Sequence, residues 1–402
     1  MKKTVVILLL VFLPFWVWSQ SKRELEEFAR KQKQEQERLK QEQEKGLVDL
    51  LAEYEKYVIA EQKAYAAFKK QVEKEWGKGN AVESTNKDWV EYSDDHKSRS
   101  IVDFEKGEAK VEIILGEKEG LDTEKLRRKL ENEVIRLIEN RGTSKDYDTE
   151  YEKRRQLGEE PVLAGQVETP EGGKISKENL PEAAKEIVEK GEPEIKKVKG
   201  EDGKEREVVV FSLPLAPDHI RVRAKRYEAE VENFCTKYGF DPALVYAVIH
   251  TESYFNPKAK SYVPAYGLMQ IVPHYAGKDA YRYVYGKDKR PTANYLYEPQ
   301  NNVELGTAYL HLLYTRSFQE VKDPRSRMLC VIAAYNTGAG NVSRAFTGNT
   351  RLSNAIPKIN KYSYEDLYTY LSRRLPAQET RDYIRKVTER MQQYMQWRSS
   401  LN

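Results

Sequence analysis

Residues 241–253 of the chain read DPALVYAVIHTES, a polar residue and a proline followed by an apolar run that ends in a single carboxylate. Asp241 can cap a helix, and Pro242 suits the first helical position, where no amide hydrogen is needed. Glu252 then lies about three turns further on, at the C-terminal end of the helix. The negative pole of the helix dipole and the apolar neighbours both disfavour ionisation, so they predict a raised pKa for Glu252. Such a carboxyl keeps a proton near neutral pH and is a candidate general acid.

Four further motifs follow Glu252-Ser253, and their order is more informative than any one of them. In sequence order they are Ala259-Lys260-Ser261, Gly267-Leu268-Met269-Gln270, Ala334-Tyr335-Asn336 and Glu379-Thr380-Arg381-Asp382-Tyr383. Together they resemble the motif series of the soluble-lytic-transglycosylase family, which is goose-lysozyme-like. The resemblance covers residues 218–397 and implies an α-helical lysozyme-like catalytic domain that cleaves peptidoglycan. One member of the family also resembles the chain at residues 273–279 and 304–310, and more faintly at 94–100.

The resemblance implies a role for each motif residue. Glu252 would be the catalytic acid, and the Tyr383 hydroxyl would reach it. Ser261 would bind and orient the substrate, and Gln270 would contact the N-acetyl sugar. The remaining residues expected to bind substrate are Ser253, Met269, Tyr335 and Asn336. Plainer interpretations stay open, because Ser261 could merely start a turn, Met269 could belong to the core and Asn336 could be a structural anchor.

The available carboxylates bear on the reaction. A hydrolysing glycosidase generally needs a second carboxylate within about 5 to 10 Å of the acid. Those nearest in the chain have other expected roles, since Asp241 caps a helix, Asp279 lies in a helical stretch and Glu298 begins a helix. We therefore expect Glu252 to act first as acid and then as base, while the muramyl C6 hydroxyl supplies the nucleophile. The predicted reaction cleaves the β-1,4 bond from MurNAc to GlcNAc, leaves 1,6-anhydromuramyl ends and needs no metal and no cofactor.

Two other functions remain as alternatives. A goose-type lysozyme would use the same fold and acid but would add water to the bond. A non-catalytic peptidoglycan-binding scaffold would keep the groove without the acid. The presence of Glu252 together with Ser261, Gln270, Tyr335 and Tyr383 disfavours the scaffold.

The N-terminal segment is typical of an exported protein. Residues 1–19 combine two lysines, an apolar run and a small-residue cleavage site, as a secretory signal does. The apolar run is shorter than the ~20 residues that span a bilayer, so we expect cleavage and export to the periplasm or cell envelope. No cysteine lies near the cleavage site, so a lipid anchor is not expected, and membrane association is left open. Residues 20–46 are almost wholly charged or glutamine and are expected to form a helical or disordered stalk.

Residues 47–213 are expected to form a smaller α+β domain ahead of the catalytic domain at 218–397. Apolar residues recur at helical spacing between Leu47 and Trp76. Two hairpins are predicted, with turns at Lys106-Gly107 and Asp202-Gly203, and helices are predicted at 123–140 and 177–190. The segment with His96, Lys97 and Arg99 is either a glycan or partner surface or, more ordinarily, a solvated loop.

The catalytic region is predicted to be helical almost throughout. One helix is expected from Asp218 with a glycine cap at Gly239, and a tyrosine-rich loop is expected at 278–297. The other expected helices cover residues 298–315, 326–335 and 377–397. Cys235 and Cys330 could form a disulfide, but two buried free thiols are favoured because no sequence feature brings them together.

Length and composition agree with a two-domain chain and argue against one class of partner. The chain has 402 residues, more than one ordinary domain, and 39% of them are hydrophobic, enough for packed cores. Charged residues make up 33% but are mixed in sign, with a net charge of only +4, which argues against a nucleic-acid binder. The family resemblance implies peptidoglycan glycan strands as the partner, and protein partners are left open.

Overall fold

The structure is a computed structural model, and it describes residues 55–116, 123–261 and 265–400. The expected signal sequence at 1–19 and stalk at 20–46 lie outside the described residues. The chain forms two compact units. The smaller unit includes the helical residues 55–65 and residues 149–151. In this unit the rings of Tyr57 and Tyr151 meet edge-on, with centroids 6.1 Å apart. The larger unit holds the remaining described residues.

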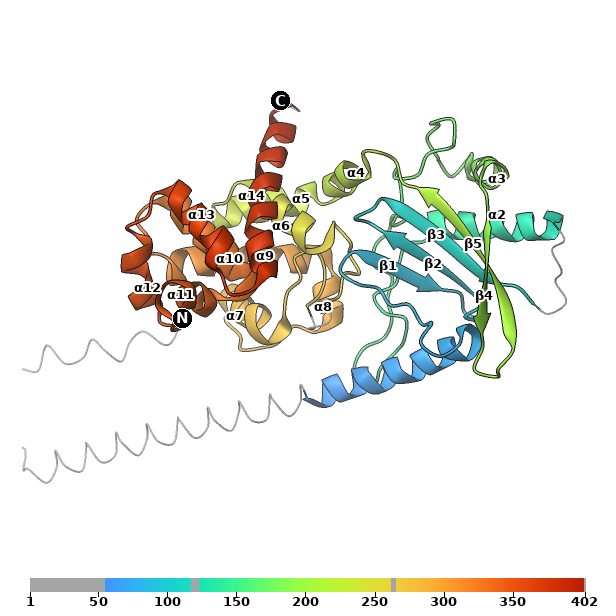
Figure 1. Cartoon of the computed structure of the whole chain (residues 1–402), viewed down its shortest axis with the longest axis horizontal. Helices are drawn as coiled ribbons and strands as arrows, with labels where there is room; N and C mark the ends of the chain where they lie inside the picture. Colours follow the sequence, from blue (N-terminus) through green and yellow to red (C-terminus); the bar gives the residue numbers. More distant parts are fainter. Residues whose placement is uncertain (1–54, 117–122, 262–264, 401–402) are drawn as a thin grey trace, which may run out of the picture. The chain divides into compact units, whose positions relative to one another are not determined.

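A five-stranded antiparallel sheet forms the α+β part of the larger unit (Figure 1). Its strands are β1 (Asp88–Tyr92), β2 (Ser98–Asp103), β3 (Glu108–Ile114), β4 (Glu194–Lys199) and β5 (Glu205–Pro214), in the order β1-β2-β3-β5-β4. Both predicted hairpins are confirmed, because β2 pairs with β3 and β4 pairs with β5 across the expected turns. The helices α2 (Thr123–Glu139) and α3 (Leu180–Lys190) pack on the sheet and close its core, to which Leu130, Val134, Val111 and Phe211 contribute.

The structure corrects two expectations in the α+β part. Helix α3 begins at Leu180, later than its predicted start, because the Asn179 side chain closes a turn in front of it. Arg99 is not part of a solvated loop. It is buried, it pairs with Glu112 at 2.5 Å, and its guanidinium lies 3.9 Å from the ring centre of Trp76. The idea of a glycan surface at Arg99 is therefore wrong.

The rest of the larger unit is helical. Its α-helices are α4 (His219–Arg226), α5 (Glu228–Tyr238), α6 (Pro242–Ser253), α7 (Lys278–Tyr285), α8 (Ala293–Tyr297), α9 (Pro299–Leu312), α10 (Pro324–Thr337), α11 (Ala339–Thr347), α12 (Leu352–Ile359), α13 (Tyr364–Arg374) and α14 (Gln378–Ser399), with π-helical turns η2 (Pro273–Gly277) and η3 (Leu313–Ser317). Helix α6 is buried on all sides from Ala243 to His250 and packs against α5 and α14. It is the centre of the helical core.

Two predictions in the helical part need correction, whereas the helices expected at 298–315, 326–335 and 377–397 are confirmed. The single helix expected from Asp218 is divided at Tyr227 into α4 and α5, although its end at Gly239 is a left-handed cap with φ of 76°, as predicted. The expected loop at 278–297 contains α7 and α8. Its tyrosines pack on one another, with the ring centroids of Tyr281 and Tyr295 5.7 Å apart.

The predicted fold class, a helical catalytic region preceded by a smaller α+β region, is confirmed (Figure 1). Cys235 and Cys330 are buried free thiols, as favoured from the sequence. Within the described ranges, none of the helices combines the length and the apolar composition that crossing a bilayer requires.

Candidate active site

The candidate acid lies in the last turn of α6, and local chemistry fixes this helix at both ends. The Asp241 carboxylate accepts a hydrogen bond from the amide of Ala243 at 2.8 Å, and Pro242 occupies the first turn. At the other end, Tyr254 takes a left-handed conformation with φ of 51°. The predicted cap and the predicted place of Glu252 at the end of the helix are confirmed.

The environment of Glu252 favours its protonated form. The side chain keeps some accessible surface, as a proton donor to a substrate must, but dense protein surrounds it. Burial is the main reason that the pKa of Glu252 is raised to about 8; the Tyr383 hydroxyl of α14 lowers it, and the negative charge of Glu379 raises it. Tyr335 of α10 also lies near enough to feel the charge of Glu252. A carboxyl with this pKa is mostly protonated at pH 7.

Tyr383 is buried beside the acid without a well-formed partner. Its hydroxyl makes no hydrogen bond of ordinary geometry within the described chain, although it is close enough to Glu252 to lower the pKa of that carboxyl. Its own pKa is raised well above the usual value, first by burial and then by the Glu252 charge. Tyr383 therefore stays a neutral hydroxyl dipole next to the acid.

The turn at 267–270 is locked to α6 by polar contacts. The Ser253 hydroxyl donates to the Leu268 carbonyl at 2.7 Å, and the Tyr335 hydroxyl donates to the Met269 carbonyl at 2.9 Å. The Asn302 side chain of α9 accepts from the Met269 amide at 2.7 Å. Because Ser253 and Met269 are fully buried, with 0% exposure, their side chains shape the turn from inside.

Gln270 ends this turn and has one polar atom left over. Its backbone takes φ of 48°, and its side-chain amide donates to the carbonyls of Ala259 at 3.0 Å and Gly267 at 2.9 Å. Its Oε1 atom is buried and accepts no hydrogen bond within the described chain. Since a buried acceptor without a partner costs free energy, this oxygen is an uncompensated polar group inside the turn.

Asn336 and Ser261 have contacts that favour their plainer interpretations. The Asn336 side-chain oxygen accepts from the Thr380 hydroxyl at 2.7 Å, which links α10 to α14. The Ser261 amide donates to the Ala265 carbonyl at 3.2 Å, and its hydroxyl accepts from the Ala265 amide at 3.3 Å. The contact of Asn336 is typical of a structural anchor, and the contacts of Ser261 are typical of a turn.

Two residues near the site were missed from the sequence. Glu379 was overlooked as a possible second acid, although it precedes Tyr383 by one helical turn and therefore shares a face with it. Asn302 is buried and bonds to both sides of the 267–270 turn, at Met269 and at the Tyr266 carbonyl, 2.7 Å away. No local sequence signal distinguishes this asparagine from a surface one.

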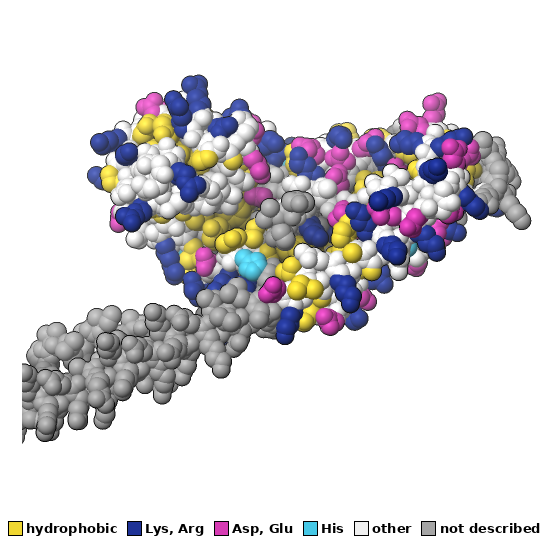
Figure 2. Space-filling view, turned by 60° about the horizontal axis from the view of Figure 1, so that its bottom comes forward, with side chains coloured by type: hydrophobic (Ala, Val, Ile, Leu, Met, Phe, Trp, Pro, Cys, Tyr) yellow, Lys and Arg dark blue, Asp and Glu magenta, His cyan; other side chains and the backbone are white. Residues whose placement is uncertain are grey.

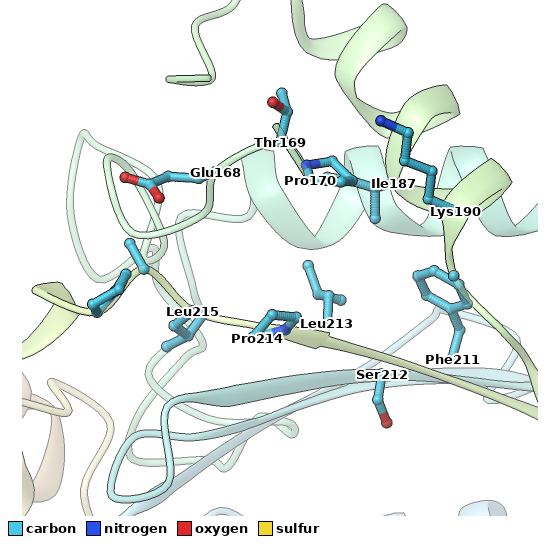
Figure 3. Close-up of a pocket in the computed structure, with 13 residues that line it drawn as sticks. Glu168, Thr169, Pro170, Ile187, Lys190, Phe211, Ser212, Leu213, Pro214 and Leu215 are labelled. Carbon is cyan, nitrogen blue, oxygen red and sulfur yellow. The ribbon is translucent and has the colours of Figure 1, made fainter. Parts of the chain in front are cut away.

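A separate pocket of about 410 Å³ lies in the α+β part, between α3 and β5 (Figure 3). Ile187, Phe211 and Leu213 form its apolar wall, and Lys190 lies at its edge, where it donates to Glu171 at 2.9 Å. None of the candidate site residues lines it.

On the helical part, hydrophobic side chains gather in a hollow (Figure 2). Across the described residues, no group of three His, Cys, Asp or Glu could hold a metal ion.

Comparison with known proteins defines first the class and then the family. Residues 231–356, which include Glu252, match the family model described as Transglycosylase SLT domain. Residues 40–226 match the model described as Membrane-bound lytic murein transglycosylase C, N-terminal domain. Membrane-bound lytic murein transglycosylase C of Salmonella typhimurium is 35% identical over 81% of this chain and 87% of its own length. The protein of the same name from Haemophilus influenzae is 30% identical over the same shares. The chain belongs to the membrane-bound lytic murein transglycosylase C family.

Solved structures of lytic transglycosylases are also similar over part of the chain. Lytic transglycosylase Slt from Pseudomonas aeruginosa is 25% identical, with a TM-score of 0.34 over 43% of this chain and 24% of that one. The 70 kDa soluble lytic transglycosylase from Escherichia coli is 23% identical, with a TM-score of 0.31 over 41% and 23%. The chain thus spans about a quarter of each of those proteins.

Proposed function

We propose that the protein is a lytic transglycosylase of the cell envelope that cleaves peptidoglycan between MurNAc and GlcNAc and leaves 1,6-anhydromuramyl ends. The observation that carries this proposal is Glu252, a partly accessible carboxyl whose pKa is raised to about 8 within the SLT domain. Such a group holds its proton at neutral pH and can still reach a substrate.

Glu252 performs two steps in this reaction. It first protonates the glycosidic oxygen, so that the bond to the muramyl anomeric carbon breaks while the muramyl N-acetyl oxygen closes on that carbon. As a carboxylate, Glu252 then removes the proton of the muramyl C6 hydroxyl, whose oxygen displaces the N-acetyl oxygen. The 1,6-anhydro ring forms, Glu252 recovers its proton, and no water is consumed.

The other candidate residues divide into those that meet the glycan and those that hold the site. Tyr383 tunes the acid, Gln270 contacts the N-acetyl sugar, and Ser261 binds and orients the substrate. The contacts of Ser253, Met269 and Asn336 support a framing role. Ser253 is bonded to the 267–270 turn, and Asn336 is bonded to α14. Met269 lies in the turn, and its amide donates to the Asn302 side chain of α9. Tyr335 does both, because it bonds to Met269 and adjoins Glu252.

Export and domain organisation are part of the proposal. Residues 1–19 act as a cleaved signal, residues 20–46 as a stalk, residues 47–213 as the α+β domain and residues 218–397 as the catalytic domain. We propose that no lipid is attached, because the cysteines of the chain are Cys235 and Cys330, both far from the cleavage site and buried. Incorporation of a labelled fatty acid into the mature protein would contradict this.

Turbidity of purified sacculi tests the assignment of the acid. Glu252→Gln should lower the clearing rate by about 10²-fold or more, because an amide cannot donate the proton. Glu379→Gln is the matched control, since Glu379 is the other carboxylate whose charge acts on Glu252. It should keep wild-type activity near pH 6. If Glu379→Gln is as inactive as Glu252→Gln, two carboxylates are needed, and the lysozyme alternative replaces the proposal.

A further inference from the structure

The chain that follows the catalytic acid is strained. Tyr254 and Phe255 are consecutive non-glycine residues with positive φ, 51° and 62°. The left-handed region is unfavourable for residues with a Cβ, and more so for bulky ones. Such a segment persists only where its surroundings hold it in place. The contacts that hold this one therefore also fix the end of α6, where Glu252 lies.

Much of that support comes from the α+β part. The Arg223 guanidinium of α4 donates to the Tyr254 carbonyl at 3.0 Å, and it is held in turn by the Phe104 carbonyl of the α+β part, to which it donates at 3.2 Å. The Asn256 side chain donates to the carbonyls of Thr85 and Asp88, at 3.3 and 3.2 Å. The segment directly before β1 is thus bound to the chain just after the acid.

One contact from this segment reaches the acid residue itself. The Asn86 side-chain amide donates to the backbone carbonyl of Glu252 at 3.1 Å. The last carbonyls of an α-helix have no partner inside the helix, and Glu252 is the penultimate residue of α6. Asn86 is two residues before β1, whose pairing with β2 begins at Asp88 opposite Asp103. The sheet thereby supplies a donor at a fixed place for the end of the catalytic helix.

We infer that Asn86 is a positioning residue for Glu252, and that through it the α+β part completes the active site of the helical part. The inference rests on the proposed function. Asn86 touches no reacting atom; it holds the backbone of the acid, so that the carboxyl keeps its place beside Tyr335 and Tyr383. Without this bond, the carbonyl takes water as its partner, and the last turn of α6 gains freedom.

The loss of Asn86 should have a signature in the pH profile. The groups that face the Glu252 carboxyl are Tyr383 and Glu379 from α14 and Tyr335 from α10. Arg390 of α14 bonds to the His250 carbonyl in the same last turn. Burial is the main cause of the raised pKa of Glu252, so a wetter and looser carboxyl has a lower pKa. The alkaline limb of activity then moves to lower pH.

The test compares full-length wild type with Asn86→Ala and Asn86→Leu, the second being close to asparagine in size but unable to donate. Asn80→Ala is the matched control, because the Asn80 amide donates to the carbonyl of Trp76 at 2.8 Å, at the end of the helical residues 66–76. Steady-state rates on soluble glycan strands are measured from pH 5 to pH 9, and thermal melts check folding.

We expect both Asn86 variants to lose kcat by roughly tenfold or more with little change in KM, and to shift the alkaline limb to lower pH. Asn80→Ala should keep the wild-type kcat and profile. Wild-type kcat and an unshifted limb in either folded Asn86 variant would overturn the inference while leaving the proposed function in place. A loss of kcat in Asn80→Ala as large as that in the Asn86 variants would also overturn the inference. An inactive wild type would overturn the proposed function itself, and the inference with it.

Discussion

Glu252 shows how far a single residue can be interpreted from the sequence. The cap at Asp241 and the apolar run correctly predict that it ends a helix and has a raised pKa. The expected causes were the helix dipole and apolar neighbours, whereas the structure gives burial first and adds Glu379. Burial by α10 and α14 depends on residues more than 80 positions away in the chain, which local spacing cannot predict.

The raised pKa predicts that Glu252 lowers the stability of the protein at neutral pH. Below pH 4.5 the carboxyl is protonated in both the folded and the unfolded chain; between 4.5 and about 8 the unfolded chain loses the proton while the folded one keeps it. Stability therefore falls as pH rises through this window and levels off above it. Glu252→Gln should raise the free energy of unfolding by about 1 to 3 kcal/mol at pH 8. This value is smaller than the full effect of the pKa shift, because the side chain is partly exposed.

Urea denaturation at pH 4, 6 and 8 measures this difference. The advantage of Glu252→Gln should be absent at pH 4 and should grow toward pH 8. An advantage that is the same at all three pH values, or a loss of stability at pH 8, would show that the acid is not held in its protonated form.

Tyr383 should affect rate less than Glu252 but should move the pH profile. Its hydroxyl lowers the pKa of Glu252, so Tyr383→Phe should shift the alkaline limb of kcat/KM to higher pH. The rate should fall by about tenfold, because the proton donor remains. Tyr394→Phe is the control: it removes another buried hydroxyl of α14, which lies 3.2 Å from His250 Nδ1. If Tyr383→Phe has the wild-type rate and profile, Tyr383 is only a packing residue.

Secondary structure was predictable where the signal is local. The turn glycines Gly107 and Gly203 have positive φ, as a hairpin turn requires, and both hairpins were predicted. The division between α4 and α5 was not predicted, because it depends on distant partners. The Arg226 guanidinium donates to the carbonyls of Val162 and Ala164, at 3.1 and 3.3 Å, which ties α4 to a loop of the α+β part. The sequence alone does not show these partners.

The close packing of the 267–270 turn against α8 leads to a prediction about stability. Gly267 has φ of 74°, and a Cβ there would lie 2.3 Å from the Leu296 carbonyl oxygen, so Gly267→Ala must displace α8 or the turn. We expect it to destabilise the protein by about 3 kcal/mol or more and to reduce activity. Gly286→Ala is the matched control, with φ of 67° and nothing within 4 Å, and it should lower stability by only about 1 kcal/mol.

Thermal and urea unfolding of the two glycine variants separate these effects. Both lose the freedom of glycine at positive φ, and only Gly267→Ala also meets a backbone atom. Equal loss of stability in the two variants would mean that the turn is not held as tightly as its contacts indicate.

The larger unit joins its two parts through buried polar groups. The Lys258 ammonium, 3% exposed, donates to Asp146 at 2.9 Å and to the Val90 carbonyl at 3.2 Å. Arg223 donates to the Gln166 side chain at 2.7 Å. A buried charge needs such partners, because removing one of them leaves the charge uncompensated. In the sequence both residues look like surface cations. The motif order therefore predicted the fold class, but it did not reveal the dependence of the helical part on the sheet.

The products of digestion test the central claim most directly. Purified sacculi are digested with the wild-type protein, and the released muropeptides are analysed by mass spectrometry with and without borohydride reduction. A single carboxylate that serves as acid and then as base leaves the C6 hydroxyl as nucleophile, so the predicted muramyl ends are 1,6-anhydro. They resist reduction and are lighter by one water than hydrolysis products. Glu252→Gln should release none of them above background. A digest dominated by reducible muramyl ends would contradict the account and identify the enzyme as a hydrolysing muramidase.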